Sequence, residues 1–283
     1  MPHELVSAIF ELGPLPVGFT NHHAQSWVLR VVGRCAPQVS ADAHEKDAPR
    51  PFTVWAGTYE ELGGAYSPVH PRATALLRVT SVSEPMSVVL RELAAAPPRE
   101  TAFGSQFVPV LSATTNSVMH PLAACTPAAA LAAEAQTGPL DRRVTLHFLT
   151  PTAFGSRPKQ LFPLADRVFG YILHLWNAYV SENERIPAAV AAHLQRALQV
   201  ESHFLATREP VRLAGFREKG FVGWCEYSVA RDAPPSVARA LQLLARASFF
   251  TGVGGRTAMG MGQVVWEPVA RGAKPIERHA YAR

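Results

Sequence analysis

The residues best suited to bind a ligand form a glycine-rich segment near the C-terminus, Gly252-Val253-Gly254-Gly255-Arg256-Thr257-Ala258-Met259-Gly260-Met261-Gly262. Two Gly–hydrophobic–Gly brackets enclose five residues, among them the cation Arg256. Glycine allows positive φ and close backbone approach, and successive free N–H groups in such a loop form a concavity that suits phosphate. A Walker A loop or a dinucleotide fingerprint would follow a strand and open a helix, whereas this segment follows a helical pattern and precedes a strand pattern. The segment therefore indicates an anion site of another kind.

Composition and charge narrow the class of protein. The chain has 283 residues, of which 48% are hydrophobic and 17% charged, as in a folded globular protein. The net charge is +5, but residues 1–140 sum to −3 and residues 141–283 to +8, so an anionic partner would favour the second half. The same arginines could also be merely solvated.

Targeting and redox features indicate a cytoplasmic protein. No apolar run reaches membrane-spanning length, and the N-terminus has no basic region followed by an apolar one. The cysteines Cys35, Cys125 and Cys225 are odd in number and far apart, which favours reduced thiols and offers no zinc knuckle.

Hydrophobic periodicity predicts two similar halves. In the first half, the expected strands and helices alternate as strand-helix-strand-strand-helix-strand, with a polar loop over Ala36–Arg50. The elements are Glu4–Leu12, Asn21–Gly33, Pro51–Ala56, Ala73–Val82, Glu84–Ala96 and Gln106–Leu111. This order is the ferredoxin-like pattern.

The second half repeats that order after a connector at 121–141, with one extra helix at Ala188–Val200. Its other elements are Arg143–Leu149, Leu164–Val180, His203–Leu213, Phe221–Val229, Ser236–Phe249 and Gln263–Trp266. We therefore expect an α+β protein of tandem ferredoxin-like (RRM-like) domains, 1–120 and 142–283, each an antiparallel sheet with helices on one face.

These motifs resemble a known family. The bracketed glycine segment is similar to the C-terminal signature of the CRISPR-associated RAMP proteins, and most of all to that of the Cas-six endoribonucleases. Phe148-Leu149-Thr150-Pro151-Thr152 resembles that family's Phe-x-Thr-Pro-Thr segment, and His44 followed by Arg50-Pro51-Phe52-Thr53 resembles a histidine-containing family segment. The resemblance covers nearly the whole chain.

The resemblance implies metal-independent cleavage of CRISPR precursor RNA within the repeat, without a cofactor. The ribose 2′-OH would attack the adjacent phosphate, leaving 2′,3′-cyclic phosphate and 5′-hydroxyl ends. Such a step needs a base, an acid and positive charge beside the phosphate, and histidine suits either proton transfer.

Three residues are the candidates for this chemistry. His44 is the first candidate. The structural alternative is that His44 is an ordinary exposed histidine in a loop. His23 is its rival, because a helix N-terminus favours anions and lowers a histidine's pKa. It is preferred over His22 because it lies one turn before Trp27, and packing at the start of the helix is the structural alternative for both. Arg50 would stabilise the phosphorane or serve as a strand-edge cation. Leu29 occupies the position where some family members carry a tyrosine.

The predicted RNA contacts come from the second half. They are Gly252, Gly254, Gly255, Arg256, Thr257, Gly260, Gly262, Arg157 and Lys159. The glycines could instead make a tight connection between the last helix and the last strand, and both roles can hold at once.

Two other functions compete with the nuclease. The chain could be a non-catalytic RAMP subunit that holds guide RNA in a CRISPR effector complex, or a ferredoxin-like small-molecule enzyme or regulatory domain. The expected partner is CRISPR repeat RNA in precursor crRNA, with no membrane partner. Effector-complex subunits and a homodimer partner are left open.

Overall fold

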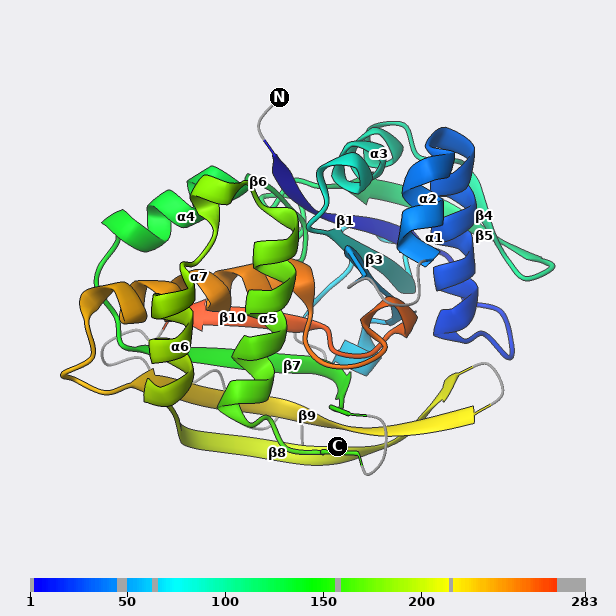
Figure 1. Cartoon of the computed structure of the whole chain (residues 1–283). Coiled ribbons are helices and arrows are strands. Elements are labelled where there is room, and N and C mark those ends of the chain that lie inside the picture. The colour runs from blue at the N-terminus through cyan, green and yellow to red at the C-terminus, as the bar shows by residue number, and fades with distance from the viewer. Residues whose placement is uncertain (1–2, 45–49, 63–65, 156–158, 214–215, 269–283) are drawn as a thin grey trace.

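The computed structural model describes residues 3–44, 50–62, 66–155, 159–213 and 216–268, which build two antiparallel sheets (Figure 1). The first sheet has the order β2-β3-β1-β5-β4, and β6 pairs with β1 beside β5. Its strands are β1 (Glu4–Leu12), β2 (Phe52–Thr58), β3 (Ala75–Ser81), β4 (Glu100–Phe103), β5 (Gln106–Thr114) and β6 (Ala124–Pro127).

Helices α1 (Asn21–Cys35), α2 (Pro37–His44) and α3 (Glu84–Ala95) belong to this first domain, and a short 3-10 turn, η1, spans Glu60–Leu62. Alternation along β1 separates its two faces, because successive side chains point to opposite sides of a strand. Val6, Ala8 and Phe10 pack with Trp27 of α1, whereas Ile9 packs on the other side, toward the second domain.

The second sheet has the order β10-β7-β9-β8, formed by β7 (Arg143–Thr152), β8 (Leu198–Leu213), β9 (Phe216–Val229) and β10 (Val264–Pro268). Helices α5 (Ala165–Tyr179), α6 (Ala188–Ala197) and α7 (Pro235–Thr251) lie with it, joined by the turn η2 (Glu182–Glu184). Leu146 and Phe148 of β7 share a core with Trp176 of α5 and Leu244 of α7. The predicted tandem ferredoxin-like fold is confirmed.

The connector joins both domains through regular structure. Its strand β6 extends the first sheet by pairing with Glu4–Ser7, and its helix α4 (Ala128–Thr137) packs against α7. The alanines of α4 explain its helicity, because alanine is the strongest helix former.

The sequence-based prediction missed one short helix and two short strands. The segment Ala36–Arg50, predicted as a polar loop, contains α2, in which Pro37 occupies a first-turn position that proline tolerates. Strands β4 and β6 are four residues each, too short to show a clear alternation. All three depend on partners elsewhere in the chain.

A buried arginine joins the domains. Arg78 of β3 is 1% exposed; it donates to Ser7 Oγ (3.1 Å), to Gln263 Oε1 (3.1 Å) and to the Phe249 carbonyl (2.8 Å). Its guanidinium also lies 4.3 Å from the centre of the Phe249 ring. Burial lowers the pKa of Arg78 to about 10, so the group is still charged at neutral pH.

Threonine and glutamine side chains extend this network. Thr80 Oγ1 donates to the Phe250 carbonyl at 2.5 Å, and Gln263 Nε2 donates to Thr53 Oγ1 at 2.9 Å. The end of α7 and the start of β10 are thereby bound to β2 and β3. Since the glycine-rich segment connects α7 to β10, this network fixes both of its ends against the first domain.

We expect Arg78→Met to lower the free energy of unfolding by about 3 kcal/mol or more, because several hydrogen bonds to a charged group are lost and buried acceptors are left unsatisfied. Urea unfolding followed by circular dichroism would measure this. The matched control is Arg91→Met: Arg91 pairs with Glu4 with 37% of its side chain exposed, so the change should stay below about 1 kcal/mol. Equal effects of the two changes would contradict a special role for Arg78.

Candidate nucleic-acid interface

The glycine loop, Gly252–Gly262, runs from the end of α7 through the 3-10 turn η3 (Thr257–Met259) to β10. It packs against the segment Thr150–Ala153 at the end of β7. Gly255 N–H donates to the Ala153 carbonyl (2.9 Å) and Gly262 N–H to the Pro151 carbonyl (3.1 Å). Two of the segments that carried the family resemblance therefore form one structural unit.

The bracketing glycines are needed for this packing. A Cβ atom at Gly254 would lie 2.7 Å from the Ala153 carbonyl oxygen, and one at Gly262 would lie 2.1 Å from the Val253 carbonyl oxygen. Both residues also have positive φ, at 89° and 67°. Any side chain would therefore meet backbone and adopt a strained conformation.

Only part of the loop reaches the surface. Gly252, Gly254, Gly260 and Gly262 are buried, Gly255 is half-buried and Arg256 is exposed. Thr257, another predicted RNA contact, is 4% exposed. RNA contact by the loop stays a prediction, and the geometry concentrates it on Gly255 and Arg256, with the buried glycines shaping the turn.

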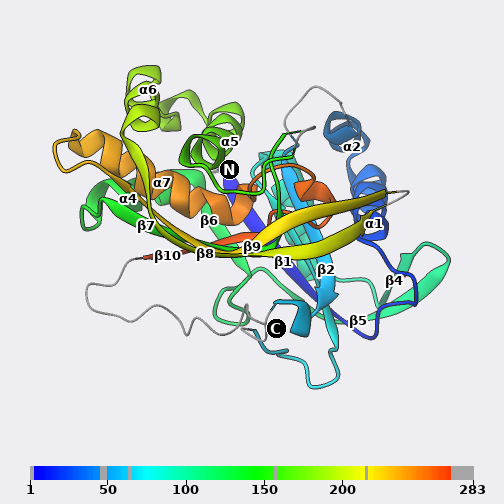
Figure 2. The same ribbon diagram turned by 90° about the horizontal axis from the view of Figure 1, so that it is seen from below.

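The cationic residues predicted to bind RNA converge. Arg256 Nε donates to Glu218 Oε2 (2.8 Å), and Lys159 Nζ lies 2.5 Å from Glu218 Oε1. Glu218 belongs to β9, in the long β8–β9 hairpin that extends to α1 (Figure 2). Arg157, the remaining predicted contact, lies outside the described residues.

The first domain contributes the start of α1 to the same region. The side-chain amide of Asn21 makes two hydrogen bonds with the backbone of Ala56. Its Oδ1 accepts from the Ala56 N–H (2.6 Å), and its Nδ2 donates to the Ala56 carbonyl (3.1 Å). A Cβ atom at Gly260 would lie 2.4 Å from Asn21 Cγ. The glycine loop thus fits closely against the N-terminus of α1.

The candidate histidines lie between Asn21 and Ala56 in the chain. His44 is the last residue of α2 rather than part of an irregular loop, and its side chain is outside the described part of the structure. His23 Nδ1 accepts the Thr20 N–H at 3.1 Å, which caps α1 and gives this ring a structural role. The neighbouring His22 has a buried Nδ1 without a hydrogen-bond partner.

Arg50 is exposed and lies two residues before β2, near the glycine loop. Its charge acts on the phenol of Tyr171 in α5, whose Oη lies 3.3 Å from Thr257 Oγ1. Burial raises the pKa of Tyr171, and the Thr257 hydrogen bond and Arg50 oppose that rise. Arg50 therefore acts on the same phenol that Thr257 of η3 contacts.

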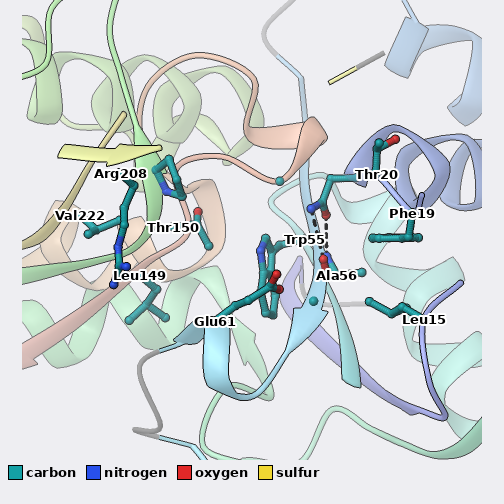
Figure 3. Close-up of a pocket in the computed structure, with 14 residues that line it drawn as sticks. Leu15, Phe19, Thr20, Trp55, Ala56, Glu61, Leu149, Thr150, Arg208 and Val222 are labelled. Carbon is teal, nitrogen blue, oxygen red and sulfur yellow. Dashed lines mark hydrogen bonds between the residues drawn. The ribbon is translucent and has the colours of Figure 1, made fainter. Parts of the chain in front are cut away.

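A cleft of about 360 Å³ lies between the domains on the Gly260 side of the loop (Figure 3). Phe19, Trp55 and Glu61 line it from the first domain, and Arg208 and Val222 from the β8–β9 hairpin. Figure 3 shows Trp55 and Glu61 between Arg208 on one side and Phe19 on the other. Exposed aromatic rings near a cation are surfaces on which unpaired nucleobases stack, but Trp55 is 5% exposed, so the half-buried Phe19 is the ring that this cleft presents.

The described part of the chain contains neither a cluster of metal ligands nor a helix that could span a membrane. No group of three or more His, Cys, Asp or Glu side chains gathers there as a metal site would. Across the same residues, no helix is both long and apolar enough to cross a membrane.

We expect Gly254→Ala to lower the free energy of unfolding by about 1–3 kcal/mol, because the methyl group meets the Ala153 carbonyl and φ is positive. Gly255→Ala is the matched control: its Cβ would lie 3.7 Å from the same oxygen, and the change should cost less than about 0.5 kcal/mol. Thermal unfolding of both variants would measure the difference. A tolerated Gly254→Ala would refute the packing role.

Comparison with known proteins supports the predicted family. Residues 146–264 match the family model of the CRISPR-associated endoribonuclease Cas6. The matched range includes the glycine loop and the Thr-Pro-Thr segment. No curated protein sequence matches the chain.

Solved structures of Cas6 share the fold. Two Cas6 product complexes match with TM-scores of 0.76 and 0.77 at 23% and 24% identity, each covering 94% of this chain and 100% of the other. The Cas6 of Thermus thermophilus matches with a TM-score of 0.67 at 22% identity, covering 93% and 98%. The family model over residues 146–264 and this common fold confirm the resemblance of the chain to the Cas6-type CRISPR endoribonucleases that the sequence predicted.

Proposed function

We propose that this chain is a metal-independent endoribonuclease that binds CRISPR repeat RNA and cuts precursor crRNA. The observation that carries the proposal is the glycine loop, which has the family's sequence pattern and packs against the N-terminus of α1 and, through η3, against β2. Similar Cas6 structures are described as a product complex and a substrate mimic complex, which supports RNA processing by this fold.

The cleavage step requires no group beyond the RNA and the protein. The 2′-oxygen forms a bond to the adjacent phosphorus while the bond from phosphorus to the 5′-oxygen breaks. One group takes the proton of the 2′-OH, and another gives a proton to the departing 5′-oxygen. The products are a 2′,3′-cyclic phosphate and a 5′-hydroxyl.

The residues predicted from the sequence divide these roles in the proposal. His44 takes the proton of the 2′-OH or gives one to the 5′-oxygen. Arg50 stabilises the negative charge that develops on the phosphate in the transition state, where a fixed cation has its largest effect. Arg256 and Lys159 bind the RNA backbone beside them. His23 is the second candidate for the proton transfer, although it already accepts a hydrogen bond from Thr20.

We expect the wild-type protein to cleave a labelled cognate repeat in EDTA, and a single 2′-deoxy substitution at the scissile nucleotide to abolish cleavage, because the attacking hydroxyl is then absent. Denaturing electrophoresis with end-group analysis would show the cyclic phosphate. Tight binding without cleavage would instead place the chain with RAMP subunits that hold guide RNA. Absence of binding would exclude both RNA functions.

We expect His44→Ala to reduce the single-turnover cleavage rate by about 100-fold or more while the Kd for the repeat stays within a few-fold, because proton transfer contributes at that level. His23→Ala should mainly cost about 1 kcal/mol of stability through the lost cap. His193→Ala on α6, away from the glycine loop, is the control (Figure 1). A large loss of cleavage rate in His23→Ala, but not in His44→Ala, would show that His23 rather than His44 transfers the proton.

A further inference from the structure

One buried carboxylate holds both cations that were predicted to bind RNA. The Glu218 side chain is 8% exposed and makes ion pairs with Lys159, at 2.5 Å, and with Arg256, at 2.8 Å. The three residues come from separate segments: the connection after β7, the β8–β9 hairpin and the glycine loop. No sequence motif indicated this cluster, because 38 residues separate Glu218 from Arg256.

The cluster presents positive charge to solvent. Lys159 and Arg256 keep 30% and 37% of their side chains exposed, whereas the carboxylate lies beneath them. Burial by itself would raise the pKa of Glu218, but the hydrogen bonds from Lys159 and Arg256 outweigh it and the pKa is lowered. Glu218 is therefore ionised at neutral pH, and the three groups together carry one net positive charge.

The backbone of Arg256 is strained to reach this position. Its φ is 62°, and among the described residues it is the one non-glycine with positive φ. A left-handed conformation costs a residue with a Cβ roughly 1 kcal/mol or more, and such outliers cluster at functional sites. A glycine would fit this backbone better, so the arginine side chain supplies something that the fold itself does not need.

We propose that Glu218 is a positioning residue that orients Lys159 and Arg256 as a fixed pair toward the phosphates of the RNA backbone and limits binding of unrelated RNA. This inference rests on the proposed RNA-binding function. Holding two flexible cations in place before RNA arrives lowers the entropic cost of ordering them at binding. Cancelling one of their charges weakens the sequence-independent attraction that every RNA shares.

The test compares Glu218→Gln with Glu226→Gln. Glu226 also lies on β9 and pairs with Arg143 at 3.1 Å, so its change removes the same unit of negative charge outside the cluster. Kd values are measured by filter binding at several salt concentrations, for the cognate repeat and for an unrelated RNA of equal length.

For Glu218→Gln we expect tighter binding of the unrelated RNA, with a salt slope steeper by up to about 0.7, and no gain for the repeat. The ratio of the two Kd values should fall by about 5-fold or more, whereas Glu226→Gln should leave it unchanged. Equal ratios in the two variants would overturn the proposal. A wild-type protein that binds no repeat RNA would instead overturn the proposed function.

Arg256→Gly provides an independent test, because it relieves the strained backbone. We expect its stability to equal or exceed that of the wild type, while its affinity for the repeat falls about 10-fold. Wild-type affinity in this variant would overturn the proposal. A clear loss of stability with unchanged selectivity would also overturn it, since the ion pair would then serve only the fold.

Discussion

The Arg78 guanidinium lies where the two sheets meet, and the candidate site depends on it. Its hydrogen bonds reach Ser7 in β1, the end of α7 and Gln263 at the start of β10. The glycine loop spans the short distance between those last two points. A charge buried at this position tolerates few alternative arrangements of the domains, because each one would leave it without acceptors.

The glycine loop has two faces with different requirements. Toward the interior, backbone carbonyl groups lie so close to Gly254 and Gly262 that neither position has room for a side chain. Toward solvent, Arg256 occupies a backbone conformation that suits glycine better. The interior face explains why the loop has its shape, and the exposed face shows where that shape is used to present charge.

Much of the fold could be predicted from the sequence because its long elements show clear periodicity. The strand β1 was predicted with its observed ends, and α5 and α7 to within one or two residues. Strands β4 and β6 escaped prediction because pairing, rather than their own four residues, makes them strands. The sequence also located the glycine loop and the cations Arg256 and Lys159, but the pairing of Glu218 with them depends on the register of the β8–β9 hairpin.

The connector between the domains is built into both of them. Strand β6 completes the first sheet and α4 packs on α7, so neither end of the connector can swing without breaking a core. The two domains are thus linked by ordered structure that is anchored at both ends. If RNA binds across both domains as proposed, RNA sequences that bend at little energetic cost to follow both surfaces will be favoured even where no base is touched.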